Sequence, residues 1–302
     1  MSVSIRDDAE ILRKVTPKLA VAAMRSALVA LSDGQLSAPP RISSDLDTVK
    51  IDFTSGNFKN NWFGYRSNPS INGKEGEQIV TLHDYDTGRL QAVAIGNVLG
   101  PLRTGAIGAV AVDLMSSKTA STLTILGSGP QAWAQAWAIS SVRELNKVKV
   151  YSPNEQKRTA LVQRIRTELE LDAIAVDSEQ IAVEDSDLIV LATNSRQPVI
   201  NSQWISPNAH INTLGPKYRG NSEFGTDLIE RCKLGATDSP KQLETYADRL
   251  IFSREHLNDV IGLSSLVNKT DLNQLESRRP TIFFSVGLAG TEVFLLQALF
   301  NQ

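Results

Sequence analysis

From about residue 120 onward, short apolar runs alternate with longer segments whose apolar side chains recur at helical spacing. A short buried strand followed by a helix, repeated several times, is typical of βαβ units and a parallel sheet. The expected strands are residues 123–126, 148–151, 174–176, 188–192, 210–214, 234–236 and 282–286. The second half of the chain therefore predicts a Rossmann doubly wound parallel sheet, and the fold class is α/β.

The first part of the chain follows a different pattern. Residues 7–33 carry apolar side chains at helical spacing, with Pro17 near the first turn of the longer helix and Gly34 as its stop. Residues 39–99 alternate short β-type runs with Gly, Asn and Asp turns, and residues 79–95 predict a hairpin closed at residues 86–88. This part predicts a mixed α+β domain beside the Rossmann sheet.

The join between the two parts has no flexible linker. We expect residues 104–120 to form a helix that connects the domains rigidly. The last predicted strand is followed by a final helix that begins at Glu292.

Composition narrows the function classes. A chain of 302 residues is long enough for two domains, and 41% hydrophobic with 21% charged residues is ordinary for a globular protein. The net charge of -2 lacks the basic excess of proteins that bind nucleic acid. Cys232 is the only cysteine and the three histidines lie far apart in the sequence, so neither a disulfide nor a metal site is expected.

Targeting signals are not predicted. The N-terminal residues carry acids early and no apolar core, which argues against a signal peptide. No apolar run approaches the roughly 20 residues that span a bilayer. We therefore expect a cytoplasmic enzyme with no membrane partner.

A glycine-rich turn follows the first strand of the second half. Gly127, Gly129 and Ala132 fit the pattern G-x-G-x-x-A, between a predicted strand and a predicted helix. The first glycine allows a tight turn, the second lets backbone approach a pyrophosphate, and the small third residue lets the helix pack closely. We expect a dinucleotide to bind there, in contact with residues Gly127, Ser128, Gly129, Pro130 and Gln131. The alternative is a tight turn without a ligand.

The second strand bears on which dinucleotide is used. Ser152 stands where an acid would bind the ribose hydroxyls of NAD. Ser152 and Asn154 could bond a 2′-phosphate, with charge from Lys157 or Arg158, so NADP is favoured and NAD remains possible. Glu155 is the argument for NAD, and Lys157 and Arg158 could instead be the solvated face of the next helix.

Several longer motifs resemble one known family. They are "PLRTGAIGAVAVDLMS" at 101–116, "LGSGPQAWAQAWAI" at 126–139, "LATNSRQPVI" at 191–200, "HINTLGPKYRGNSEF" at 210–224 and "FFSVGLAGTEV" at 283–293. In this order and spacing they resemble the ornithine cyclodeaminase/mu-crystallin family. The resemblance implies a substrate-binding and homodimerisation domain, residues 1–119 plus 288–302, and a Rossmann dinucleotide-binding domain, residues 120–287, with substrate held between them.

The resemblance also implies a chemistry. Family members oxidise an amine α to a carboxylate, or reduce the matching imine, by hydride transfer; they include cyclodeaminases, alanine dehydrogenases, ketimine reductases and an opine-like synthase. Such a substrate needs its carboxylate held by fixed cations, and a planar guanidinium does this through two parallel hydrogen bonds. Arg41 and Arg103 match the two arginines of the family pattern. A structural salt bridge is the alternative for each.

Three positions depart from the family pattern or match it weakly. Arg66 replaces a lysine, which keeps the charge but gives a poor proton donor. Asp52 fills an acid position if a one-residue gap is allowed. Lys217 replaces the aspartate of cyclodeaminases, which argues against ornithine cyclodeamination and suits an anionic or neutral substrate. Lys217 could donate a proton if burial near Arg66 and Arg103 lowers its pKa, or it could point to water from a loop.

Further cofactor contacts are expected at the carboxyl edge of the sheet and in the late "SVGLA" motif. These residues are Thr104, Thr193, Asn194, Ser195, Gly287 and Leu288, the last two by backbone.

The sequence as a whole predicts an NADP-preferring reductase of a small α-imino acid, cyclic or open-chain, in amino acid metabolism. Arg41, Arg66 and Arg103 would bind the carboxylate, and Lys217, Asp52 or water would supply the proton. Two alternatives remain: an NAD-dependent amino acid dehydrogenase or cyclodeaminase-like enzyme, and an NADP-binding crystallin-type protein without catalysis.

Overall fold

The computed structural model describes residues 3–269 and 278–301. The chain divides into two compact units, one formed by Met1–Arg103 with Gly287–Gln302 and the other by Thr104–Val286. The residues that follow Arg103 bond within the second unit: Gln135 donates to the carbonyl of Thr104 (3.3 Å) and Asn212 to that of Gly108 (3.1 Å).

The second unit is built on a parallel sheet of eight strands. The order of its described strands is β11-β10-β9-β12-β13-β18-β16-β17, and every pairing is parallel. The strands are β9 (Thr122–Leu126), β10 (Lys147–Tyr151), β11 (Ala173–Ala175), β12 (Leu188–Leu191), β13 (His210–Thr213), β16 (Leu234–Thr237), β17 (Ile261–Gly262) and β18 (Thr281–Phe284). Chain order reverses between β9 and β12, as in a doubly wound sheet. The predicted fold class is confirmed.

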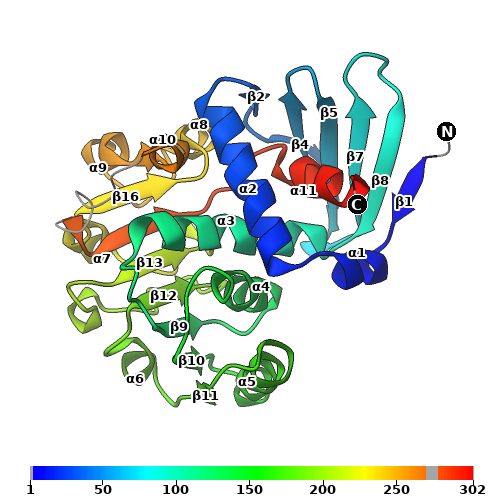
Figure 1. The fold of residues 1–302 in the computed structure, drawn as a ribbon. Coiled ribbons are helices and arrows are strands. Elements are labelled where there is room, and N and C mark those ends of the chain that lie inside the picture. Colours follow the sequence, from blue (N-terminus) through cyan, green and yellow to red (C-terminus); the bar gives the residue numbers. More distant parts are fainter. Residues whose placement is uncertain (1–2, 270–277, 302) are drawn as a thin grey trace. The chain divides into compact units, whose positions relative to one another are not determined.

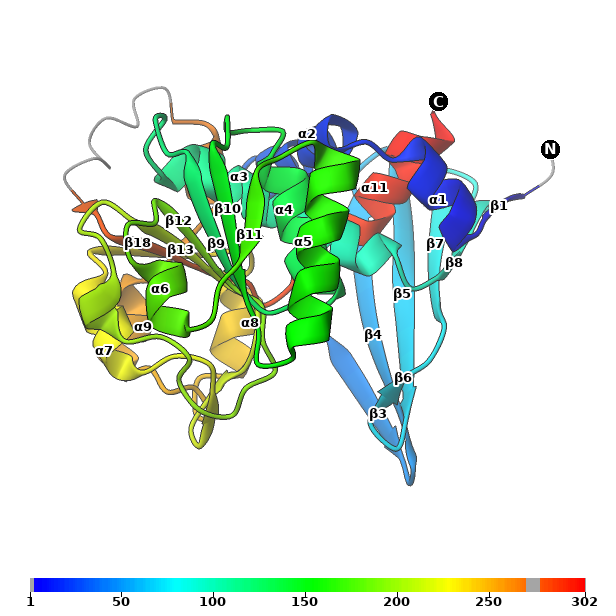
Figure 2. The same ribbon diagram turned by 90° about the horizontal axis from the view of Figure 1, so that it is seen from below.

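Helices cover both faces of this sheet (Figure 2). Helices α4 and α5 contact β9 and β10 on one side, and α6 contacts the same strands on the other. The helices are α3 (Leu99–Met115), α4 (Pro130–Ile139), α5 (Glu155–Leu169), α6 (Glu179–Val183), η1 (Ser202–Trp204), α7 (Thr226–Arg231), α8 (Pro240–Thr245), α9 (Arg254–Asp259) and α10 (Ser264–Val267), with a short hairpin of β14 (Lys217–Tyr218) and β15 (Asn221–Ser222).

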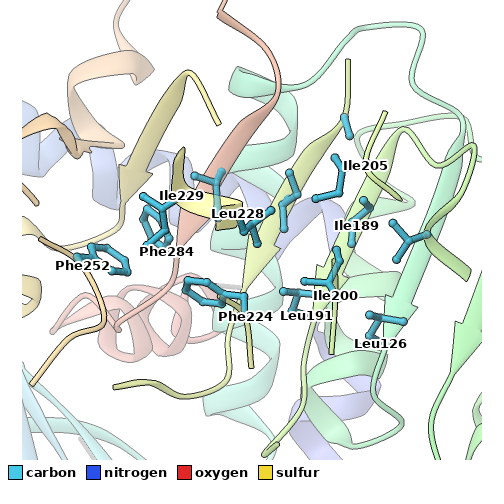
Figure 3. Close-up of a cluster of buried hydrophobic side chains, with 14 of the residues drawn as sticks. Leu126, Ile189, Leu191, Ile200, Ile205, Phe224, Leu228, Ile229, Phe252 and Phe284 are labelled. Atoms are coloured by element: carbon cyan, nitrogen blue, oxygen red, sulfur yellow. The ribbon is translucent and has the colours of Figure 1, made fainter. Parts of the chain in front are cut away.

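A cluster of buried apolar side chains fills one face of the sheet (Figure 3). Leu126, Leu191 and Phe284 are the last residues of β9, β12 and β18, and all three belong to the cluster. The ring of Phe252 lies 4.6 Å from that of Phe284. Burial of each such side chain contributes about 1.5–3 kcal/mol. The core therefore extends to the carboxyl ends of the strands and fixes where the following loops begin.

Helix α3 differs from its prediction at both ends. It spans Leu99–Met115 instead of residues 104–120. The carboxylate of Asp8 accepts the N–H groups of Asn97 (2.9 Å) and Val98 (3.0 Å), which fixes an earlier start. At the other end, Arg143 donates to the carbonyls of Val112, Asp113 and Ser117. Residues 116–120 are not helical because these carbonyls bond to a guanidinium.

The first unit is a mixed sheet with helices on one face. The described strands follow the order β1-β8-β7-β5-β4-β2, with β3 on β4 and β6 on β5. The pairs are antiparallel except β1 with β8. The strands are β1 (Ser4–Arg6), β2 (Leu36–Ser37), β3 (Ile42–Leu46), β4 (Val49–Phe58), β5 (Trp62–Ile71), β6 (Lys74–Glu75), β7 (Gln78–Asp84) and β8 (Leu90–Gly96). The predicted hairpin, β7–β8, is confirmed.

The helical stretch predicted at residues 7–33 is two helices, α1 (Asp8–Lys14) and α2 (Pro17–Ser32). The hydroxyl of Thr16 accepts the N–H of Leu19 (3.2 Å) and Pro17 takes the first helical position, so α2 has its own start. Within the described residues no single helix is long and apolar enough to cross a membrane, and the bent pair α1 and α2 meets that criterion only when both are counted together.

Helix α11 (Thr291–Phe300) packs on the sheet of the first unit beside α2 (Figure 1). The indole N–H of Trp62 donates to Gln297 (2.7 Å), and the Trp62 ring meets that of Phe294 edge-on at 5.0 Å. Trp62 is fully buried, whereas Phe63 and Tyr65, its neighbours on β5, are 37% and 43% exposed. Helix α11 thus covers one face of the sheet, whereas the side chains on the other face are exposed.

Replacing Arg143 with methionine should lower the free energy of unfolding by about 2–4 kcal/mol. The reason is that Asp113 and the last carbonyls of α3 would lose buried donors. Lys118→Met removes the other cation on Asp113 but should cost less than about 1 kcal/mol, since Lys118 is 63% exposed. Urea denaturation followed by circular dichroism measures both, and equal losses would contradict the expectation.

Candidate dinucleotide and carboxylate sites

The predicted cofactor loop forms a tight turn at the end of β9. Gly127 adopts φ +127°, a conformation that L side chains rarely adopt. A Cβ added to it would lie 2.2 Å from the carbonyl oxygen of Ala192, which follows β12. The turn therefore requires glycine and lies beside the point where strand order reverses, the usual ligand position in such sheets.

Helix α4 begins at this turn with its N-terminus uncapped by a side chain. Gly129 is the N-cap and makes no side-chain hydrogen bond, and Pro130 takes the first helical position. A Cβ added to Gly129 would meet no heavy atom within 4 Å among the described residues. The buried Oε1 of Gln131 has no hydrogen-bond partner within that same part of the chain. Open space and N–H groups without a side-chain cap at a helix start fit a pyrophosphate, whereas the amide oxygen of Gln131 is an acceptor and would need a donor from the ligand.

The residues expected to choose the dinucleotide lie after β10. Ser128 donates to the hydroxyl of Ser152 (2.9 Å), so both hydroxyls face the turn. The side chain of Asn154 caps α5 by accepting the N–H of Lys157 (2.9 Å), and the Lys157 side chain is exposed. Arg158 bonds the carbonyl of Ser152 (3.2 Å) and pairs with Asp177 (2.8 Å). Arg158 is therefore held beside the end of β10 and is not part of a fully solvated helix face.

The loop after β12 is fixed by a buried acid. Glu223 accepts the N–H of Thr193 (3.0 Å), its hydroxyl (2.8 Å) and the N–H of Gly215 (2.6 Å). Burial raises the pKa of Glu223, and Lys217 opposes that shift. Ser195 donates to the carbonyl of Gln197 (2.7 Å), while Asn194 is exposed. Three cofactor contacts are expected in this loop, at Thr193, Asn194 and Ser195. Of these, Thr193 is the residue that bonds the carboxylate of Glu223.

Lys217 points inward, contrary to the alternative that it faces water. Its Nζ donates to the carbonyls of Gly215 (2.8 Å) and Ser285 (3.1 Å), and the residue is 5% exposed. Burial lowers its pKa, whereas Glu223 and Asp238 raise it. Asp238 in turn accepts the N–H of Val286 (2.9 Å). Lys217 thus ties the end of β13 to the end of β18, and its proposed role as a proton donor stays a prediction.

In the first unit, two of the expected arginines meet on one acid. Oε1 of Glu292 accepts Nη1 of Arg66 (2.7 Å) and both Nε (3.0 Å) and Nη2 (2.9 Å) of Arg103. Burial opposes ionisation of Glu292, but Arg103 and Arg66 outweigh it and lower its pKa to about 2. The three residues come from β5, α3 and α11, so one buried carboxylate joins three elements.

The third expected arginine lies beside the same group. A Cβ added to Gly287 would lie 3.3 Å from Nη2 of Arg41 and 3.6 Å from Nη2 of Arg103. Gly287 has φ +91°, which disfavours any L side chain there. The first unit therefore brings Arg41, Arg66 and Arg103 together, and their role in binding a substrate carboxylate stays a prediction. Leu288 follows with a buried side chain, and its carbonyl accepts the hydroxyl of Thr291 (2.6 Å).

Asp52 lies on β4 near this cluster by register. Thr54 pairs with Arg66 across β4 and β5, so Asp52 is the diagonal neighbour of Arg66 on the same face, about 7–8 Å away. Its carboxylate bonds the hydroxyl of Ser43 and pairs with Lys50 at 3.6 Å. Asp52 thus has partners on β3 and β4, and its assignment as a catalytic acid stays a prediction.

Sequence reasoning missed three buried acids: Glu292, Glu223 and Asp238. Glu292 stands in the apolar segment "TEVFLLQALF", where a single acid in the first turn is a signal for a buried counter-ion. Asp238 follows β16 of the parallel sheet, at the edge where polar residues gather, and Glu223 follows β15 of the short hairpin. Among the described residues no group of three or more His, Cys, Asp or Glu side chains could hold a metal ion.

A parallel sheet that reverses order beside a glycine turn, with an open helix start, is the architecture of a nicotinamide-dinucleotide oxidoreductase of Rossmann type. The chain belongs to the ornithine cyclodeaminase/mu-crystallin family, whose model matches residues 3–302. It is 30% identical over 240 residues to Delta(1)-pyrroline-2-carboxylate reductase from Bacillus cereus, covering 78% of this chain and 74% of the relative.

Two solved structures share the whole fold. Thermococcus litoralis Delta(1)-pyrroline-2-carboxylate reductase, in complex with NADH and L-proline, has a TM-score of 0.86 at 21% identity and covers 99% of this chain and 97% of its own. An archaeal alanine dehydrogenase dimer with bound NAD has a TM-score of 0.85 at 21% identity, covering 100% of this chain and 96% of its own. At these identities the likeness shows the fold alone.

Alanine substitutions at the two loop glycines should separate folding from binding. Gly127→Ala should destabilise the protein by about 2–3 kcal/mol, because of its φ and the overlap with Ala192. Gly129→Ala should change stability by less than about 1 kcal/mol. It should nevertheless weaken NADPH or NADH binding at least about tenfold, since its methyl group would occupy the phosphate position. Thermal denaturation and fluorescence titration measure these effects, and unchanged binding by Gly129→Ala would exclude a dinucleotide there.

Proposed function

We propose that this protein is an NAD(P)H-dependent reductase that converts a small α-imino acid, preferentially a cyclic one, into the amino acid. The observation that carries the proposal is the convergence of Arg41, Arg66 and Arg103 around Gly287 and Glu292. Three guanidiniums that converge on one place suit an anionic substrate. Family membership and the glycine turn at Gly127 support the redox chemistry.

The cofactor and the arginines have separate roles in this reaction. When bound, the reduced nicotinamide supplies a hydride to the imine carbon. Arg41 and Arg103 hold the substrate carboxylate through paired N–H groups, and Arg66 adds charge beside them. Reduction of the C=N bond also consumes one proton at nitrogen. We assign that proton to Lys217, Asp52 or a bound water, while Arg66 keeps its proton at neutral pH.

Lys217 also bears on the choice of substrate. A cationic residue at this position gives no counter-ion for the side-chain amine of ornithine, so a diamino acid is disfavoured. Its charge is already balanced by Glu223 and Asp238. A neutral ring carrying one carboxylate fits this arrangement. Delta(1)-pyrroline-2-carboxylate, the compound in the name of the Bacillus cereus relative, is such a molecule.

We further propose a preference for NADPH over NADH. Ser152 follows β10 and carries no carboxylate that would repel a 2′-phosphate. Arg158 lies at the same place, bonded to the carbonyl of Ser152, and Lys157 adds a second positive charge. Asp177, the partner of Arg158, is 89% exposed, so a phosphate could replace it at small cost.

A homodimer is proposed on the exposed face of the first unit's sheet. The face opposite α11 carries large apolar side chains that are 37–43% exposed: Phe53, Phe63, Tyr65 and Ile79. The His83 ring stacks on Phe63 at 4.9 Å and extends this surface. A contiguous exposed apolar surface of this kind is typical of a protein interface.

The enzymatic proposal is tested by a substrate panel with both cofactors. We expect NADPH oxidation with Delta(1)-pyrroline-2-carboxylate and its six-membered homologue, and a kcat/KM about tenfold or more above that with NADH, worth about 1.4 kcal/mol. Pyruvate with ammonia should react more slowly. Conversion of ornithine without net cofactor turnover would instead support a cyclodeaminase, and NADPH binding with no oxidation of any substrate would support a crystallin-type protein.

The dimer is tested by two single variants, each of which replaces an exposed apolar residue with lysine. Phe63→Lys should lower the mass in solution from twice the 32.9 kDa of the chain to a single chain, because a buried unpaired charge at an interface costs several kcal/mol. Ile181→Lys is the matched control, since Ile181 is 54% exposed on α6 of the other unit. Light scattering after size exclusion gives the masses. A monomeric parent protein would refute the proposal.

A further inference from the structure

Glu292 is buried where a carboxylate is costly. It lies in the first turn of α11, 1% exposed, in a helix whose other residues are almost all apolar. An unpaired carboxylate in such a place would lose its hydration at a cost of several kcal/mol. The fold keeps it there ionised, and that requires strong compensation from its neighbours.

The compensation comes from two guanidiniums on a single oxygen. Arg66 donates from β5 to Oε1 at 2.7 Å. Arg103, from α3, donates its Nε–H to the same oxygen at 3.0 Å, and its Nη2 forms an ion pair with that oxygen at 2.9 Å. Two like charges this close repel each other unless an anion lies between them. The start of α11 adds a favourable partial charge to that anion. Glu292 therefore allows the guanidinium groups of Arg66 and Arg103 to lie close together.

The contact with Glu292 also fixes the orientation of the Arg103 guanidinium. Glu292 contacts the Nε and Nη2 atoms of Arg103, which form one edge of the planar group. Its Nη1 and Nη2 atoms lie 3.9 and 3.6 Å from a Cβ placed on Gly287, where Nη2 of Arg41 lies at 3.3 Å. A rigid fork held along one edge presents its other edge in a fixed direction.

We propose that Glu292 is a positioning residue that orients Arg103 and Arg66 to receive the carboxylate of the imino acid. This proposal rests on the proposed function. Glu292 acts through the two arginines and does not touch the reacting atoms. With a pKa of about 2 it carries no proton to donate at neutral pH, so its effect is on substrate binding and alignment.

The test compares Glu292→Gln with Glu292→Asp and with Glu10→Gln. Glu10 also accepts a hydrogen bond from an arginine of the first unit, Arg6, but lies outside the cluster around Glu292. It is therefore the matched control. We expect Glu292→Gln to lower kcat/KM for the imino acid about 100-fold, mainly through a higher KM, as a misaligned binding group does. Glu292→Asp should recover at least about tenfold of that loss, and Glu10→Gln should leave kcat/KM unchanged. Affinity for NADPH should stay within about threefold in all variants.

A double-mutant cycle with Arg66→Ala separates positioning from general damage. If Glu292 acts through Arg66, the double variant should lose much less than the product of the two single losses. Titration with L-proline in the presence of NADP+ gives a second readout that needs no turnover, and Glu292→Gln should raise the Kd about tenfold or more. Circular dichroism identifies a variant that fails to fold, in which case Glu292→Asp and the L-proline titration decide.

Several outcomes would overturn the proposal. A lower KM or Kd in Glu292→Gln would mean that Glu292 competes with the substrate for the arginines. Strictly multiplicative losses in the cycle, or an unchanged Kd for L-proline, would mean that it does not act through them. Failure of the parent protein to turn over any imino acid is a separate result, because it refutes the proposed reaction while the effect of Glu292 on carboxylate binding is still measured.

Discussion

The arrangement of the proposed carboxylate site depends on one buried ionic contact, in which Oε1 of Glu292 bonds Arg66 and Arg103. Without a central anion, mutual repulsion would drive the two guanidiniums apart, and the elements that carry them would lose a common contact. The same contact joins β5, α3 and α11. Packing of α11, through Trp62 and Phe294, places Glu292 at the correct depth, so apolar burial and charge pairing determine one geometry together.

The second unit also contains buried charged side chains, but these bond different kinds of groups. Lys217 and Glu223 belong to or follow the short hairpin, Asp238 follows β16, and all three bond backbone groups of the loops after β13 and β18. Their charges do not converge on an open surface; they tie loops together. Beside them, the turn at Gly127 leaves the start of α4 without a side-chain cap. One edge of the sheet thus combines rigid loops with exposed N–H groups, and this combination suits a phosphate-bearing ligand.

Local patterns were enough to predict the parallel sheet, the hairpin and the glycine turn, because each depends on neighbours in sequence. The bounds of α3 could not be read this way, since Asp8 caps its start from 90 residues away and Arg143 ends it from another element. The three arginines could be selected as candidates from motif and chemistry, and their role in binding a carboxylate stays a prediction. Glu292 was hidden in an apolar helix, and the inward direction of Lys217 depends on a hydrogen bond to the carbonyl of Ser285, which is 68 residues away.

The shared oxygen of Glu292 has an evolutionary consequence. Arg66, Arg103 and Glu292 are mutually dependent: losing Glu292 leaves two like charges close together, and losing either arginine removes a donor from a buried carboxylate. Divergence toward a new substrate is therefore easier at positions outside this trio, such as Lys217, than within it. Relatives that alter one member should carry a compensating change at another, so the trio should vary as a set across the lineage.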